Sequence, residues 1–96
     1  MNEIENITRE LVCRDFELEE STGYEELREL LLQKIVYLLI NDLPGLWNIL
    51  YRIDVNERKL KQVFETEQAT EIAPQITDLI LQRFREKALT RVKYRA

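Results

Sequence analysis

The chain has 96 residues, of which 45% are hydrophobic and 33% are charged, and its net charge is -4. This balance is typical of one globular domain and excludes a disordered chain. The sequence has no histidine and one cysteine, which excludes Ser-His and Cys-His catalysis, the common zinc sites that use imidazole, and an intramolecular disulfide.

Helix formers dominate the composition. Leu, Ile, Glu, Arg, Lys and Gln are the main residue types, and the sequence contains only two glycines and two prolines. Most of the main types favour helices, and few turns are available. We therefore expect an all-α fold, a compact antiparallel bundle of three to five helices with short loops.

Residues 1–21 form an acidic N-terminal segment, and residues 22–96 are the predicted bundle domain. Within the N-terminal segment, four apolar residues follow helical spacing: Ile4, Ile7, Leu11 and Val12. That spacing predicts a short amphipathic helix, followed by a linker. The segment is either a loosely attached arm, or an arm that docks on its own domain or on a partner through Phe16 and Leu18.

The first main helix begins at Thr22 in this interpretation, because Thr22 and Glu25 have the spacing of a capping box. One face of this helix carries Leu27, Leu31, Ile35, Leu38 and Asp42. The run 35–40 is apolar nearly all round, which predicts a helix surrounded by others. Pro44 ends this helix and starts the next one. A single helix with a kink at Pro44 is the alternative.

The next two helices meet near Asp54. Apolar residues of the first repeat with helical spacing: Leu46, Ile49, Leu50 and Ile53. Asp54 and Glu57 have the spacing of a second capping box, so we expect Asp54 to cap the following helix. The buried residues of that helix are predicted to be Leu60, Val63 and Phe64.

The last helix follows a polar connection, with Thr70 as its predicted N-cap and Pro74 in its first turn. Its inward face is predicted to carry Ile72, Ile76, Leu79, Ile80, Phe84 and Ala88. We expect this helix to reach at least about Leu89, and residues 90–96 to fray.

Trp47 and Tyr51 are the first candidate site. They are spaced i, i+4 and lie about a quarter turn from the predicted inward face of their helix. Aromatic side chains are enriched in protein interfaces. The pair either widens the core or forms an interface, and a homodimer is the interface that we expect first.

The basic end of the chain is the second candidate. Residues 83–96 carry one acidic and six basic residues, whereas residues 1–32 carry ten acidic and three basic ones. The basic residues are Arg83, Arg85, Lys87, Arg91, Lys93 and Arg95, with Phe84 and Tyr94 between them. They could contact nucleic-acid phosphates, dock on an acidic protein surface, or form a solvated helix face.

Other polar groups have structural explanations. The clustered acids Glu25, Glu26 and Glu29 lie in a predicted first turn, where carboxylates are expected. The two glycines, Gly23 and Gly45, stand alone and do not form a phosphate loop. Cys13 is predicted to be an inert thiol. We therefore expect no catalytic residue, cofactor or metal.

The N-terminal residues lack the basic and apolar regions of a secretory signal, and the longest apolar run, at 35–40, is far too short to cross a bilayer. We expect a soluble, cytoplasmic protein.

The runs LYRIDV at 50–55 and ITDLI at 76–80, with Glu57 and the pair Gln82-Arg83, resemble those of small helical bacterial proteins of unknown function. The resemblance spans about residues 24–90 and implies an all-α fold. It implies no activity.

These observations together predict a non-enzymatic protein-interaction module that binds itself or another protein. The contact surfaces are predicted to be the Trp47/Tyr51 pair and the basic last helix. The alternative function is a nucleic-acid-binding accessory protein that uses the basic last helix.

Overall fold

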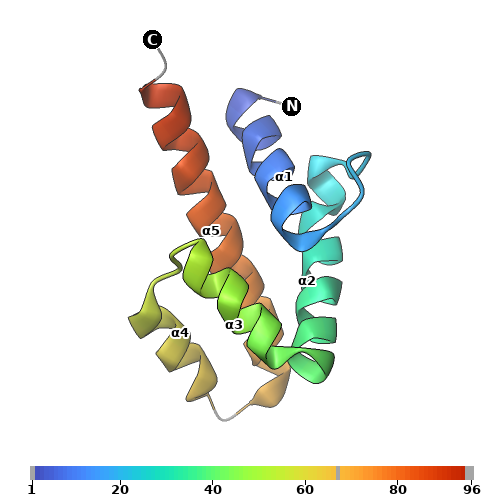
Figure 1. Ribbon diagram of the computed structural model, residues 1–96, viewed down its shortest axis with the longest axis vertical. Helices are drawn as coiled ribbons and strands as arrows, with labels where there is room; N and C mark the ends of the chain where they lie inside the picture. The colour runs from blue at the N-terminus through green and yellow to red at the C-terminus, as the bar shows by residue number, and fades with distance from the viewer. Residues whose placement is uncertain (1, 67, 95–96) are drawn as a thin grey trace.

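The computed structural model describes residues 2–66 and 68–94, which form helices and the connections between them. The elements follow one another as α1 (Glu3–Phe16), α2 (Tyr24–Asn41), α3 (Leu43–Arg52), α4 (Glu57–Phe64), the short 3-10 helix η1 (Ala69–Glu71) and α5 (Ile72–Lys93) (Figure 1). The described residues contain no strand, and the predicted all-α bundle is confirmed.

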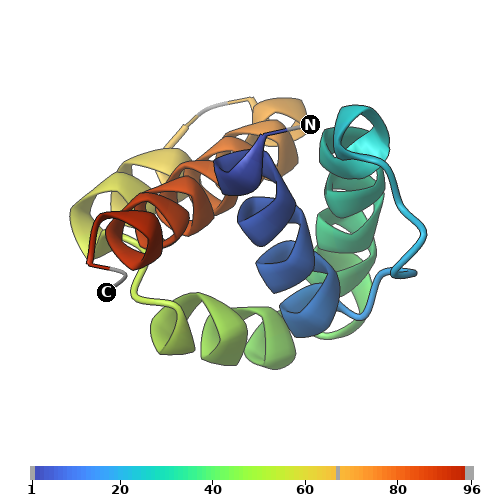
Figure 2. The ribbon, with the colours of Figure 1, turned by 90° about the horizontal axis from the view of Figure 1, so that it is seen from above.

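α5 is the central element of the bundle. It packs against α1, α2, α4 and η1. α1 and α2 lie side by side and run in the same direction, and α5 runs opposite to both (Figures 1 and 2). The buried residues of α5 are Ala73, Ile76, Thr77, Ile80, Phe84 and Ala88. The inward face of the last helix is thus largely as predicted, and the helix continues through most of the segment that was expected to fray.

The prediction that residues 35–40 are surrounded by other helices is wrong. Ile35 and Leu38 are buried, as part of the predicted face. However, Val36 is 41% exposed, Tyr37 57% and Ile40 76%. α2 lies at the edge of the bundle, so one side of its apolar turn faces the core and the other side faces solvent.

α1 belongs to the core. Its buried side chains are Ile7, Thr8, Leu11, Val12, Cys13 and Phe16. They join the same hydrophobic cluster as the buried residues of α2 to α5. The rings of Phe16 and Phe84 meet edge to face, with centroids 6.5 Å apart. Of the two predicted states of the N-terminal segment, the structure shows docking on its own chain through Phe16, and a loosely attached arm is contradicted.

The predicted capping box at Asp54 is wrong. α4 begins two residues later, and the side chain of Asn56 accepts a hydrogen bond of 3.0 Å from the backbone N–H of Lys59. Asp54 instead has a left-handed backbone with φ 62°. It closes the end of α3, because its N–H donates to the carbonyl of Tyr51 and the N–H of Val55 donates to that of Leu50. These two bonds are the Schellman pattern of a helix C-terminus.

Two further caps also differ from prediction. Thr22 is buried in the turn before α2, where its N–H donates to the carbonyl of Glu19. The N-cap of α2 is therefore Gly23, without a side-chain bond. Thr70 lies inside η1, and this 3-10 turn leads directly into α5, so the cap of α5 is Glu71. In both places a turn occupies the residue that could have capped the helix.

The junction between α2 and α3 confirms the role of Pro44. α2 ends at Asn41 and α3 starts at Leu43, with the proline in the first turn of α3. Asp42 was predicted on the inward face of α2, but it is exposed, and its carboxylate accepts a hydrogen bond from the N–H of Gly45. A Cβ at Gly45 would collide with that carboxylate, which explains the glycine.

Glu17 is the second residue with a left-handed backbone, with φ 55°, at the end of α1. We predict that Glu17→Gly stabilises the protein by about 0.5–1 kcal/mol, because glycine adopts this conformation without the steric cost of a Cβ. Urea unfolding measures the change.

Glu19→Gly is the matched control, since it removes the same charge from the same exposed turn at a residue without positive φ. We expect this control to leave stability unchanged or to lower it. Equal effects of the two substitutions would contradict the prediction.

Candidate functional site

Trp47 and Tyr51 lie on the outer side of α3. Their side chains are 41% and 79% exposed, so the alternative that they fill the core is wrong. The Trp47 ring stacks on Phe64 of α4, with centroids 5.1 Å apart and planes 29° apart. The contact holds the indole between the two helices while leaving part of its surface open to solvent.

A groove of about 580 Å³ lies between α3 and α4. We call it the α3–α4 groove. Leu50, Val55 and Leu60 line it and are almost fully buried, so they form its floor. Its aromatic lining is Trp47, Tyr51 and Phe64, and its charged lining is Asp54, Glu57, Lys61 and Glu65. The groove is therefore apolar inside and mainly acidic at its edges.

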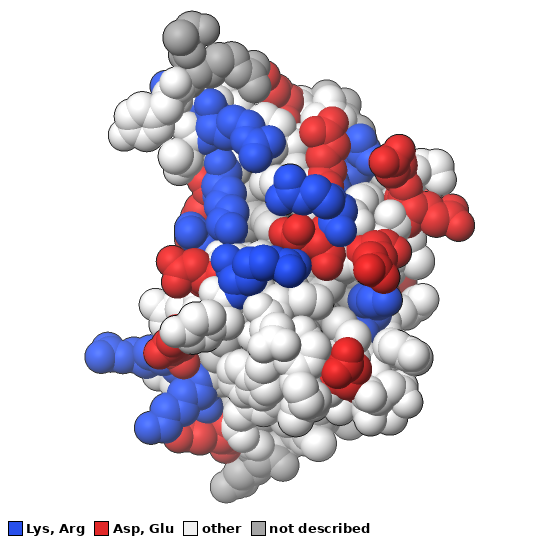
Figure 3. Space-filling model, viewed as in Figure 1, with Lys and Arg blue, Asp and Glu red and all other residues white. Residues whose placement is uncertain are grey.

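A second, apolar groove of about 370 Å³ adjoins it at Phe64, which lines both. Val36 and Ile40 of α2 line this second groove. The solvent-facing residues of the two grooves and of the α3 start form a surface that we call the apolar surface: Val36, Ile40, Leu43, Trp47, Tyr51 and Phe64. The area over α3 is largely uncharged in Figure 3, and charged side chains lie over α1, α4 and α5.

Sequence reasoning missed Val36, Ile40, Leu43 and Phe64 as surface residues. Helical periodicity placed Phe64 in the core and interpreted the apolar turn of α2 as fully enclosed. Only the position of α2 at the edge of the bundle reveals its second apolar side. The signal in the sequence was the width of that apolar turn, which exceeds what one buried face needs.

The basic residues of α5 do not form one free surface. The Arg83 Nε donates a hydrogen bond of 3.0 Å to the backbone carbonyl of Ile53, at the end of α3. Its guanidinium also pairs with Asp54 at 3.8 Å and with Glu86 at 3.4 Å. Arg83 therefore fastens α3 to α5 and is a structural residue.

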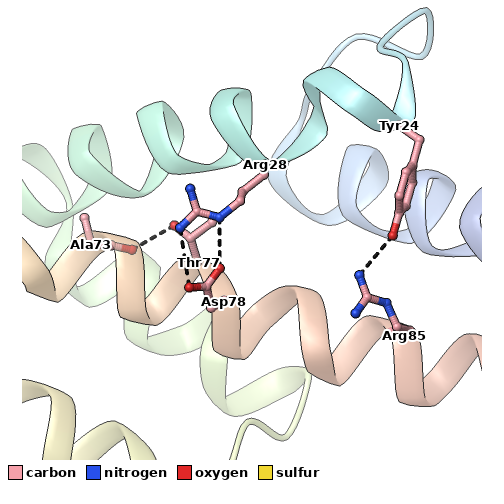
Figure 4. A network of polar contacts seen from close by, with 6 residues as sticks. All are labelled: Tyr24, Arg28, Ala73, Thr77, Asp78 and Arg85. Carbon is pink, nitrogen blue, oxygen red and sulfur yellow. Dashed lines mark hydrogen bonds and ion pairs between the residues drawn. The ribbon is translucent and has the colours of Figure 1, made fainter.

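Arg85 and Lys87 also contact other residues of the chain. Arg85 donates a hydrogen bond of 3.0 Å to the hydroxyl of Tyr24, at the start of α2 (Figure 4). Lys87 lies 5.7 Å from the centroid of the Phe84 ring. Burial lowers the pKa of Lys87, and the neighbouring charge of Arg83 lowers it further.

The end of the helix is more open. Arg91 is exposed and forms no ion pair with any residue in the described ranges 2–66 and 68–94. Lys93 is exposed as well, and Arg95 lies outside the described residues. The five basic residues that the structure describes thus divide into a bound group near the middle of α5, Arg83, Arg85 and Lys87, and an open group near its end, Arg91 and Lys93.

α2 and α5 are joined by a polar pair that sequence reasoning did not find. Arg28 contacts both carboxylate oxygens of Asp78, at 2.9 and 3.4 Å (Figure 4). The hydrogen bond and the charge of Asp78 raise the pKa of Arg28. Fifty residues separate the partners, so no local pattern in the sequence could have indicated the pair.

Cys13 is buried in α1, and its thiol donates a weak hydrogen bond of 3.6 Å to the carbonyl of Glu19. Burial raises the pKa of this thiol above its usual value. The thiol therefore stays protonated at neutral pH, in agreement with the inert role that we predicted.

Within the part of the chain that the structure describes, no three Cys, Asp or Glu side chains lie together as a metal ion would require. None of the described helices combines the length and apolar character needed to cross a bilayer.

Comparison with known proteins adds no further information about the chain. No protein-family model, curated protein or solved structure matches it. The resemblance to small helical bacterial proteins therefore stays a prediction.

The bound and the open basic residues of α5 should differ in how much they contribute to the stability of the protein. We predict that Arg83→Ala destabilises the protein by about 1 kcal/mol, because it leaves the Ile53 carbonyl without its charged donor. We predict that Arg91→Ala changes stability by less than about 0.5 kcal/mol, as expected for an exposed residue. Thermal or urea unfolding of the two variants measures the difference, and equal stabilities would show that Arg83 is not a structural residue.

Proposed function

We propose that this protein is a non-enzymatic protein-interaction module that self-associates through the apolar surface. The observation that carries the proposal is the clustering of exposed apolar side chains. Eight large hydrophobic residues of the described chain are exposed, and five of them belong to the apolar surface: Val36, Ile40, Leu43, Trp47 and Tyr51. Scattered apolar residues are normal on a surface, whereas a contiguous patch is typical of an interaction site.

Self-association is favoured by the distribution of charge. The net charge of -4 would oppose the approach of two copies, but the area over α3 is largely uncharged, and the charged side chains lie over α1, α4 and α5 (Figure 3). A two-fold dimer brings the same patch of both copies together, so an uncharged apolar patch suits it well. We also propose that the protein acts in the cytoplasm, since a single buried thiol needs no oxidising compartment.

The competing proposal is nucleic-acid binding through α5. Arg91 and Lys93 are exposed and suit it. Arg83 and Arg85 suit it less well, because they already donate to Ile53 and Tyr24. Neutralising fewer phosphates gives a weaker contact, and such binding would fall steeply with added salt, unlike an apolar dimer.

The test of self-association is Ile40→Glu. Ile40 is 76% exposed, so a carboxylate there leaves the monomer intact but is buried and unpaired in a dimer. We predict that the dimer dissociation constant rises by at least about tenfold. Sedimentation equilibrium over a range of chain concentrations measures this constant.

Tyr94→Glu is the matched control, because Tyr94 is 75% exposed and lies near the end of α5, outside the apolar surface. The proposal expects self-association of this variant to equal that of the unchanged protein. A monomeric mass for the unchanged protein at all concentrations would overturn it.

A further inference from the structure

We propose that the α3–α4 groove binds an amphipathic helix of another protein, with apolar residues on one face and basic residues along its flanks. The groove is open because its two walls are held by different partners. α3 packs on α2, and α4 packs on α5. The turn at residues 53–56 joins the two walls at one end, the stacked rings of Trp47 and Phe64 bridge them farther along, and the groove lies between them.

The length of the groove suits a short helical segment. α4 has eight residues and therefore extends about 12 Å, which is about two helical turns. A partner helix of that length presents apolar side chains at positions i, i+3 or i+4, and i+7. These apolar side chains would pack on the groove floor, which is formed by Leu50, Val55 and Leu60.

The walls favour large apolar side chains. Trp47 and Phe64 are held face to face, so their rings are ordered before a partner arrives. Tyr51 follows Trp47 one turn later on the same side of α3 and is 79% exposed. Rigid aromatic residues lose little conformational freedom on binding and supply much of the contact area in interfaces.

The charged residues at the edge of the groove determine whether a basic or an acidic partner helix is favoured. Asp54, Glu57 and Glu65 line the groove together with a single base, Lys61. The Asp54 carboxylate lies 3.8 Å from Arg83, yet its side chain is 88% exposed and can still contact a second cation. An excess of carboxylates around an apolar floor complements a basic amphipathic helix and repels an acidic one.

The chain carries its own reporter for this site, because Trp47 is its only tryptophan. The probe is a 14-residue peptide of Leu and Lys with Leu at helical spacing on one face. We expect a saturable blue shift of Trp47 emission as the peptide covers the indole. A scrambled peptide of the same composition should bind at least about tenfold more weakly, since it cannot place its Leu residues on one face.

The groove variant is Glu57→Lys with Glu65→Lys, and the matched control is Glu19→Lys with Glu20→Lys in the exposed turn after α1. We predict that the groove variant weakens peptide binding by about tenfold at low salt, and the control by less than about twofold. Circular dichroism verifies that both variants fold.

The inference does not depend on self-association, and the two proposals fail separately. Trp47, Tyr51 and Phe64 belong to both surfaces, so a dimer and the peptide would compete for them. Ile40→Glu, which lies outside the groove, should weaken the dimer without weakening peptide binding. Equal binding of the ordered and scrambled peptides, or equal losses in the groove and control variants, would overturn the inference. A shift of Trp47 emission that depends on protein concentration alone, with no response to peptide, would also overturn it and assign the groove to a second copy of the chain.

Discussion

The packing of the buried face of α5 against helices from both ends of the sequence holds this fold together. Ile76, Ile80 and Phe84 are completely buried, and Phe84 meets Phe16 of α1 edge to face. A chain of 96 residues without a disulfide has little margin for a second core. The chain therefore forms a single core, in which one long helix packs against the apolar faces of the others.

This arrangement leaves apolar residues of α2 and α3 exposed to solvent, which bears on function. α2 and α3 each bury one side, and each also carries apolar residues on the side that faces solvent. Ile40, at 76% exposed, is not needed for the core, and neither is Tyr51, at 79%. Because exposed hydrophobic residues that gather in one place are typical of interaction sites, we propose that a partner covers them.

The sequence predicted much of the fold because helical periodicity reports directly which residues face inward. The buried faces of α2 and α5 follow from spacing, and the break between α2 and α3 follows from the backbone restrictions of Pro44. The helix starts were predicted less well. Asp54 has the side chain of a good N-cap, but the end of α3 uses it in a left-handed turn, and Asn56 caps α4 instead. Local pattern could not decide between Asp54 and Asn56, which are two residues apart and both suit a cap.

The candidate site was predicted only in part for a related reason. Trp47 and Tyr51 stood out because they lie off the inward face of their helix. Arg83 and Arg91 look alike in the sequence, yet one fastens α3 to α5 and the other is open to solvent. Phe64 was predicted to be buried; it packs against the core but is only partly buried, and it also lines two surface grooves. Such differences depend on which elements meet in space, and the sequence does not contain that information locally.

The fold requires that α1 is part of the same cooperative core as α5. Hydrogen–deuterium exchange of the full chain tests this claim directly. We predict that the most protected amides of α1, around Leu11 and Val12, exchange with the same free energy of opening as those around Ile80 and Phe84, because both open only when the whole domain unfolds. Exchange of the α1 amides within seconds, while α5 stays protected, would contradict the account and return residues 1–21 to the role of a loosely attached arm.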